Sequence, residues 1–182
     1  MPDAGFTCTP TFITPWPAQA VQTAVTRPAN TTAYTAGDVC GAADTATPAN
    51  AGSAIIELTK VGPPGQVVLL RTMLLRIAAT AVPSGMTTFK VWLFNASPTA
   101  VLDNAAWPGI LTADRAKYTG INVDLSAAAD DGEQVNASAF EINKEVKLAE
   151  GSSSLFAIVQ TIGAFTPASG TVNTLQLTAL PV

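Results

Sequence analysis

The sequence predicts an all-β protein: an antiparallel β-sandwich, jelly-roll-like, of about eight strands, with an extended N-terminal arm. Short segments of alternating apolar and polar residues recur along the chain, and Gly- and Pro-rich turns separate them. No segment keeps a helical apolar period between a cap and a C-terminal glycine. Without an internal repeat, we expect an arm over residues 1–30 and one sandwich domain over residues 31–182.

The arm is expected because five of the thirteen prolines fall within the first 28 residues. Proline holds the backbone near polyproline geometry and removes a hydrogen-bond donor from a β-ladder. The large apolar side chains of Phe6, Phe12 and Trp16 are too many for an idle linker. We therefore expect the arm to lie on a surface, which belongs either to its own subunit or to a neighbour.

A strand expected over residues 53–60 is followed by the reversal Gly62-Pro63-Pro64-Gly65 and a long apolar run over residues 66–80. Within this run Arg71 and Arg76 are five residues apart, so strict alternation places them on opposite faces. Either the outer face is covered, or a β-bulge between the arginines lets both reach solvent. The bulge would turn inward Val68 and Leu70 before it, and Met73, Leu75 and Ile77 after it.

The next strand, over residues 87–95, turns Phe89, Val91 and Leu93 inward and leaves Trp92 and Phe94 on its outer face. Large outward aromatic rings need a cover. Three covers are open: the chain's own arm, a neighbouring subunit, or a ligand that stacks on the rings.

The rest of the chain predicts one short helical turn and four further strands. The turn is expected over residues 112–118, inside a long loop that starts near Asn95. Residues 121–126 and 175–179 alternate as half-buried strands, and residues 155–159 are apolar on both faces, as in a central strand. Phe140 shares its parity with Ile142, Val146 and Leu148, which predicts that it points inward, with a turn near Asn143-Lys144.

Charge and hydropathy argue against nucleic acid and membranes as partners. The chain has 9 Lys plus Arg against 13 Asp plus Glu, and its cations are scattered rather than clustered. Its longest apolar run is interrupted by Arg71 and Arg76 and is too short to span a bilayer. Because no secretory signal is visible at the N-terminus, we expect synthesis in a cytosol.

The residues for catalysis, cofactors and metals are sparse, so we expect no enzyme, no cofactor and no metal site. Histidine is absent, and Cys8 and Cys40 alone do not make a zinc site. These cysteines are expected as free thiols, with a disulfide as the alternative. The acidic cluster Asp130, Asp131 and Glu133 is best explained as a solvated turn rather than a calcium loop. A hydrolase would need two facing carboxylates, for which the sequence offers Glu57, Asp103, Asp114 and Asp124.

Several segments together resemble a family of small virion structural proteins of tailed bacteriophages and prophages. They are YTAGDVCG, VPSGMTTFKVWLFNASPTAVLDNAAW, LTADRAKYTG and INKEVKLAEGSSSLFAIVQTIGAFTPASGTV, and they span the chain from Tyr34 to its C-terminal part. The similarity lies in β-sandwich segments rather than in catalytic residues. The N-terminal arm and the two cysteines depart from the family pattern.

This resemblance implies a capsid decoration, or cement, protein that binds the major capsid protein on the outside of the head and stabilises the shell. We expect a homo-oligomer, a trimer, located in the virion after synthesis in the bacterial cytoplasm. The expected partner-binding residues are Phe6, Phe12, Trp16, Trp92 and Phe94. The alternative is a tail or tail-fibre component, or a glycan- or receptor-binding module in which Trp92 or Trp107 stacks on a sugar.

Overall fold

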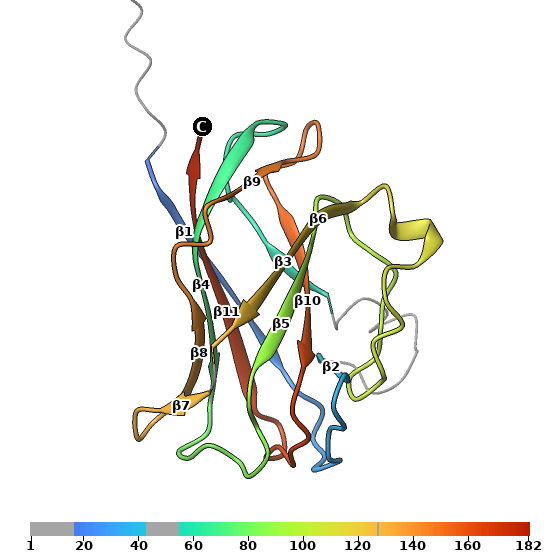
Figure 1. The fold of residues 1–182 in the computed structure, drawn as a ribbon, viewed down its shortest axis with the longest axis vertical. Helices are drawn as coiled ribbons and strands as arrows, with labels where there is room; N and C mark the ends of the chain where they lie inside the picture. Colours follow the sequence, from blue (N-terminus) through green and yellow to red (C-terminus); the bar gives the residue numbers. More distant parts are fainter. Residues whose placement is uncertain (1–16, 43–54, 127) are drawn as a thin grey trace, which may run out of the picture.

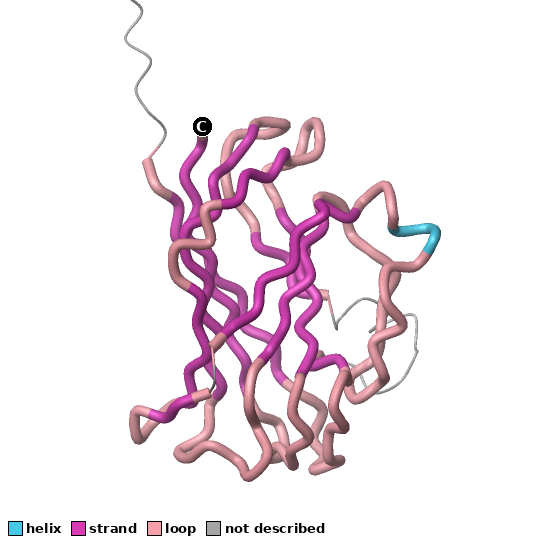
Figure 2. Tube along the Cα trace, viewed as in Figure 1, coloured by secondary structure: helices cyan, strands magenta, loops and turns pink. Residues whose placement is uncertain are grey.

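The computed structural model describes residues 17–42, 55–126 and 128–182, which form two antiparallel β-sheets packed face to face (Figure 1; Figure 2). The expected all-β sandwich is confirmed. Among the sequence predictions, those for Phe6, Cys8, Phe12 and Trp16 lie outside the described residues. No helix within the described part of the chain is long and apolar enough to cross a membrane.

The two sheets contain eleven strands between them. The first sheet has the order β1-β11-β4-β8-β7, and β9 also pairs with β4. Its strands are β1 (Gln19–Thr26), β11 (Val172–Pro181), β4 (Val67–Ile77), β8 (Val135–Ala139), β7 (Ala129–Asp130) and β9 (Lys144–Lys147). The second sheet has the order β2-β10-β5-β6, and β3 also pairs with β10. Its strands are β2 (Val39–Cys40), β10 (Leu155–Thr161), β5 (Phe89–Phe94), β6 (Tyr118–Leu125) and β3 (Ile56–Leu58).

The strand pairs are nested along the chain, which is the connectivity of a jelly roll. β1 pairs with β11, both β2 and β3 pair with β10, both β8 and β9 pair with β4, and β5 pairs with β6. β2 and β3 lie along the same partner, β10, and together act as one interrupted strand. β8 and β9 do the same along β4. If each interrupted strand is counted once and the two-residue β7 is left out, eight strands remain, in agreement with the prediction of about eight.

A β-bulge lies in β4, which is one of the two alternatives that the spacing of the arginines left open. Thr178 of β11 pairs with Thr72 and the next residue, Ala179, pairs with Leu70, so Arg71 has no partner on β11. Both Arg71 and Arg76 are half-buried on the outer side. The expected bulge is therefore confirmed, and so are the inward residues that it implied: Val68, Leu70, Met73, Leu75 and Ile77.

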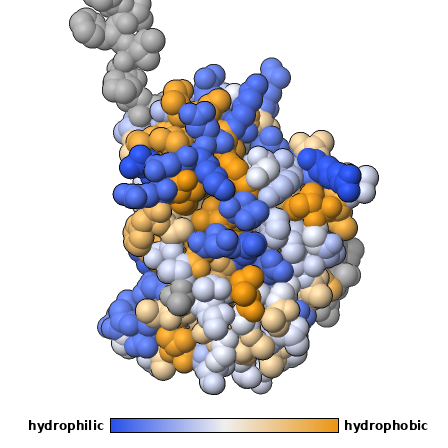
Figure 3. All heavy atoms as spheres, viewed as in Figure 1, coloured by the Kyte–Doolittle hydropathy of each residue, from blue (hydrophilic) through white to orange (hydrophobic). Residues whose placement is uncertain are grey.

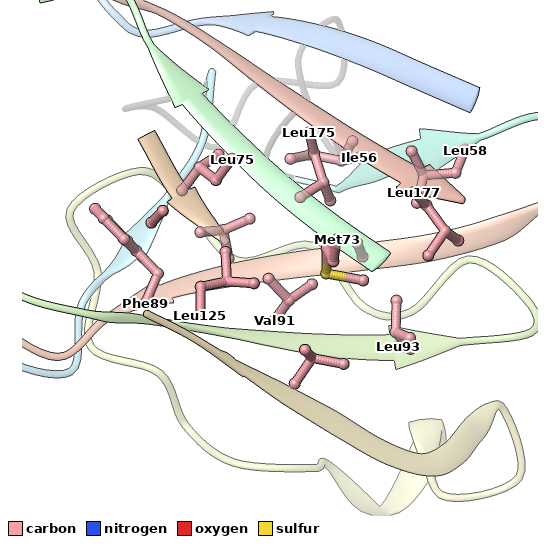
Figure 4. Close-up of a cluster of buried hydrophobic side chains, with 14 of the residues drawn as sticks. Ile56, Leu58, Met73, Leu75, Phe89, Val91, Leu93, Leu125, Leu175 and Leu177 are labelled. Atoms are coloured by element: carbon pink, nitrogen blue, oxygen red, sulfur yellow. The ribbon is translucent and has the colours of Figure 1, made fainter. Parts of the chain in front are cut away.

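The core fills the space between the two sheets (Figure 4). Leu75 and Leu177 of the first sheet face Val91 and Leu125 of the second, and none of the four is more than 2% exposed. A fully buried aliphatic side chain of this size stabilises the fold by about 1.5–3 kcal/mol. β10 is a central strand, with β5 on one side and β2 and β3 on the other, as its two-sided apolar pattern predicted.

Residues 19–26, which the sequence placed within the arm, form strand β1 of the sandwich. The strand pairs residue for residue with β11, from Gln19 opposite Ala179 to Thr26 opposite Val172. It occupies the proline-free stretch between Pro17 and Pro28, where every backbone N–H can serve a ladder. The described part of the segment over residues 1–30 thus packs against its own domain.

Candidate interaction surfaces

An aromatic cluster lies on the outer face of the second sheet. The ring centroids of Trp92 and Trp107 are 5.6 Å apart, those of Trp92 and Tyr118 are 6.1 Å apart, and those of Phe94 and Tyr118 are 5.6 Å apart. Trp107 belongs to the β5–β6 connection, residues 95–117, which packs over this face together with Val101. A segment of the chain's own domain therefore covers the outward aromatics, a cover that the sequence did not indicate.

This cover corrects the expected role of Phe94. Its side chain is 0% exposed beneath the β5–β6 connection, so it is not available to a partner in this arrangement. Trp92 keeps some exposed surface, but its indole is already engaged. Its Nε1 donates to Gln160 Oε1 at 3.0 Å, and Lys90 Nζ lies 5.7 Å from its ring centroid. These contacts tie the ring to neighbouring side chains of its own sheet, and Trp107 of the connection packs against it as well.

The β5–β6 connection also closes the β2 edge of the second sheet. Asn104 N donates to Val39 O, and Val39 N donates to Ala105 O, both at 2.9 Å. Trp107 N donates to Gly37 O at the same distance. The segment thus satisfies backbone groups that an uncovered edge strand would offer to another chain.

Asp114 anchors the part of the β5–β6 connection that leads into β6, through hydrogen bonds from Thr99 and Lys117. It ends the 3₁₀ turn η1 (Thr112–Asp114), which is the short helical turn that the sequence predicted. Asp114 Oδ2 accepts from Thr99 N at 3.0 Å, and Oδ1 accepts from Lys117 Nζ at 2.9 Å. Burial on its own raises the pKa of this carboxyl, but the bonds from Lys117 and Thr99 outweigh it, so the net shift is downward.

A buried polar network ties the same connection to β1. The Arg27 guanidinium donates to Asp103 Oδ2 at 3.0 Å and to the Tyr34 hydroxyl at 2.6 Å. The Tyr34 hydroxyl in turn donates to Asp103 Oδ1 at 2.5 Å, and Gly41 N donates to the same oxygen at 2.8 Å. Burial raises the pKa of the Tyr34 phenol far above its usual value, and the neighbouring Cys40 and Asp103 add to the effect. Tyr34 therefore acts as a neutral donor.

Cys40 is a free, buried thiol in β2, which agrees with the expected reduced state for this residue. Burial raises the pKa of the thiol well above its usual value, and the nearby Asp103 carboxylate raises it further. A neutral buried thiol packs as a small apolar group and is a poor nucleophile.

The carboxylates proposed for hydrolysis are mostly paired with cations. Asp103 is bonded to Arg27, Asp114 to Lys117, and Asp124 to Lys90. Glu57 lies exposed on β3. None of the described Asp, Glu or Cys residues gathers in a group of three that could hold a metal ion.

The acidic cluster near residue 131 forms the exposed turn between β7 and β8. Asp131 Oδ1 accepts from the backbone N–H groups of Gln134 and Glu133, and Oδ2 accepts from Asn136 Nδ2. These bonds hold the pKa of Asp131 below its usual value. The carboxylate oxygens are thus used to build a solvated turn, as the sequence predicted.

Two neighbouring cross-strand rows on the outer face of the first sheet carry little charge, whereas Arg71 and the exposed Glu145 and Lys147 of β9 lie farther along the same sheet. One cross-strand row is Gln22, Gln176, Leu74 and Ser138, and the next row is Ala24, Thr174, Arg76 and Asn136. Arg76 is the sole charged residue of the eight, and it takes part in none of the ion pairs found among the described residues. A shallow hollow at this point is lined by Gln22, Arg76, Ala78, Gln134, Val172 and Thr174.

Phe140 is a surface residue that the sequence reasoning missed. The expectation that it points inward is wrong, because 72% of it is exposed. It opens the turn between β8 and β9, in which Glu141 and Asn143 have φ angles of 54° and 48°. Left-handed backbone breaks the alternation on which the inward prediction depended. The turn's asparagine, a residue that tolerates this conformation, was the one available signal.

Comparisons with known proteins give few relatives. No known family model matches the chain, and no curated protein matches its sequence. A solved structure titled Desmodium yellow mottle tymovirus is similar at 14% identity and a TM-score of 0.30, over 91% of this chain and 87% of that one. A family two carbohydrate esterase from Cellvibrio japonicus is similar at 12% identity and a TM-score of 0.16, over 83% of this chain and 36% of that one. TM-scores this low carry no conclusion about function.

Proposed function

We propose that this protein is a structural component of a tailed-phage virion, a decoration protein that binds the outside of the head between major capsid subunits and stabilises the shell. Two features support the proposal. Segments from Tyr34 onward resemble phage virion structural proteins, and the nested strand pairs form a jelly roll, an architecture used by capsid proteins among others.

The observation that carries the proposal is the low charge of two neighbouring cross-strand rows on the outer face of the first sheet, the rows that contain Leu74 and Arg76. A solvent-facing protein surface normally mixes both signs of charge at roughly a quarter to a third of its residues. Here two full cross-strand rows hold a single charge, Arg76. Burying unpaired charge is costly, so two rows with a single charge suit a protein whose outside is covered in an assembly.

The proposed capsid contact uses the arm. The predicted contact residues Phe6, Phe12 and Trp16 precede Pro17 in the sequence, and strand β1 begins two residues after Pro17. Since Phe94 is buried and Trp92 is engaged within its own domain, the arm aromatics remain the candidate anchors. A contact of this kind is largely apolar, so we expect it to survive moderate salt, which screens only the charge–charge part of binding.

The proposal is tested on phage heads. Heads that lack this protein should lose DNA at a lower temperature than complete heads, and adding back the purified full-length chain should restore the difference. A full-length Phe6→Ser, Phe12→Ser, Trp16→Ser variant should fail to sediment with heads, whereas an Ile162→Ser control, exposed elsewhere on the domain, should still bind. Equal heat stability with and without the protein, or its location at the tail by electron microscopy, would overturn the proposal.

A further inference from the structure

The β8–β9 turn projects two exposed side chains, Phe140 and Glu141, at the edge of the sandwich, and we call this pair the β8–β9 knob. Phe140, 72% exposed, is followed by the exposed Glu141, whose left-handed backbone positions the pair. The turn is anchored where Ile142 N donates to Arg71 O at 3.0 Å, on the bulge of β4. A large apolar ring held on a fixed, strained turn in water is typical of a binding anchor. Figure 3 shows this side of the molecule, where apolar surface alternates with hydrophilic side chains.

The hollow on the outer face of the first sheet is a concave surface, whereas the β8–β9 turn projects into solvent. Val172, 38% exposed, and Ala78 supply apolar lining, and Arg76 supplies the single charge. The remaining lining residues are neutral, and Arg76 forms no ion pair with any described acid. This hollow therefore offers two apolar side chains among neutral polar ones, and a guanidinium without an ion-pair partner among the described acids. A guanidinium favours both a carboxylate and the face of an aromatic ring.

We propose that the occupant of this hollow is the β8–β9 knob of a second copy of this chain. Phe140 of one copy would pack on Val172 and Ala78 of the next, with its ring against the Arg76 guanidinium. Glu141 would pair with the same guanidinium. The charges of the knob and the hollow are opposite, and each lacks an ion-pair partner within its own described chain. Apart from Arg76, the two cross-strand rows around the hollow add no charge on that side of the contact.

The two surfaces are different parts of the molecule, so the contact is heterologous. Phe140 borders a hollow with Asn122 and Asp124 of β6, at the edge where the sheets meet, while Arg76 lies on the outer face of the first sheet. A heterologous contact repeats from copy to copy and closes into a ring when the rotation allows it. This inference rests on the proposed function and supplies the self-contact for the homo-oligomer, the trimer, that it expects.

The test measures the mass of the full-length protein by size-exclusion chromatography with light scattering, over about 1–100 μM, the range in which weak specific contacts form. The wild type should form a closed oligomer. Phe140→Ser, Glu141→Arg and Arg76→Glu should each weaken association by about tenfold or more. Matched controls are Val182→Ser, which is 70% exposed, and the charge change Glu150→Arg, both away from the two surfaces. Unchanged thermal unfolding would show that each variant is folded.

Charge exchange makes the test specific to the proposed pair. The double variant E141R/R76E should regain the oligomer. A mixture of the two single variants should associate pairwise although neither does so alone, because every matched contact then needs one copy of each. A wild type that is monomeric throughout, or an oligomer that is insensitive to Phe140→Ser, would overturn the contact. Failure of the charge exchange to restore association would do the same. None of these readouts uses heads, so failure here is distinguishable from failure of capsid binding.

Discussion

Arg27 at the end of β1 and Asp103 in the β5–β6 connection form an ion pair at 3.0 Å, with 1% of each side chain exposed. The pair joins segments 76 residues apart in sequence. Arg27 Nη1 also donates to Asn30 O at 3.1 Å, and the Tyr34 hydroxyl bonds both partners. Two charges removed from water are tolerated here because their remaining donors and acceptors are satisfied.

Removing one partner of this pair should strongly destabilise the fold. We expect Asp103→Asn or Arg27→Met to lower the free energy of unfolding by about 3–5 kcal/mol, because each leaves an uncompensated buried charge. Urea denaturation followed by tryptophan fluorescence measures this. The double variant R27M/D103N should lose less than the sum of the single changes. Additive losses would show that the two side chains do not act as a pair.

Asp114 should control how firmly the β5–β6 connection covers the aromatic cluster. Asp114→Asn keeps the shape but loses the ion pair with Lys117 and weakens the bond from Thr99, so we expect a loss of about 1–3 kcal/mol. Since the folded pKa is lowered, its contribution is present above the unfolded value and is lost as the pH falls through the folded pKa. The wild type should therefore lose more stability below about pH 4 than the variant does. Identical acid profiles for the two proteins would contradict this role.

Local patterning was sufficient for most of the strands, and it gave the bulge as one of two alternatives. With a five-residue spacing, Arg71 and Arg76 can both reach the outer side only if one extra residue lies in the strand, and the structure places that residue at Arg71. Likewise the outward parity of Trp92 followed from its neighbours Val91 and Leu93, which are both buried. Period-two alternation carries this information because it depends on adjacent residues alone.

The surfaces could not be predicted in the same way, because they depend on contacts between distant segments. Nothing near Phe94 in sequence indicates that Val101 and Trp107 fold back over it. The pattern of neighbouring residues likewise gives no sign of the ion pair between Arg27 and Asp103, which are 76 residues apart. The inward prediction for Phe140 failed because of the backbone. The left-handed φ at Glu141 turns the chain, whereas regular alternation would place the Phe140 side chain inward.

Cys40 should be unreactive in the folded protein. Burial raises its pKa, so the thiol stays neutral at pH values at which an exposed cysteine ionises. In a Cys8→Ser variant Cys40 is the one remaining thiol of this sequence. Its labelling by a thiol reagent at pH 8.5 should be at least about 100-fold slower in the folded protein than in urea. Because the folded pKa is raised, stability from this group is full below the unfolded value of about 8.5 and declines as the pH rises above it. Rapid labelling under native conditions would contradict the buried placement.

Gly85 and Gly163 mark a point where two loops at the end of the sandwich meet backbone to backbone. A Cβ on Gly163 would lie 2.2 Å from Gly85 O, and a Cβ on Gly85 would lie 2.0 Å from Ala164 O. Neither backbone atom can move aside without shifting a loop that borders the core residue Phe165. Gly85 also has a φ of 85°, so Gly85→Ala adds a conformational cost of about 1 kcal/mol to the clash.

A matched variant separates these two costs. Gly109 has nearly the same backbone, with a φ of 80°, but no atom lies within 4 Å of the place that an added Cβ would take. Gly109→Ala should therefore lose only the conformational part, about 1 kcal/mol, whereas Gly85→Ala and Gly163→Ala should lose at least about 2–3 kcal/mol. Thermal and urea unfolding measure all three. Equal losses at Gly85 and Gly109 would mean that the loops do not approach as closely as the structure places them.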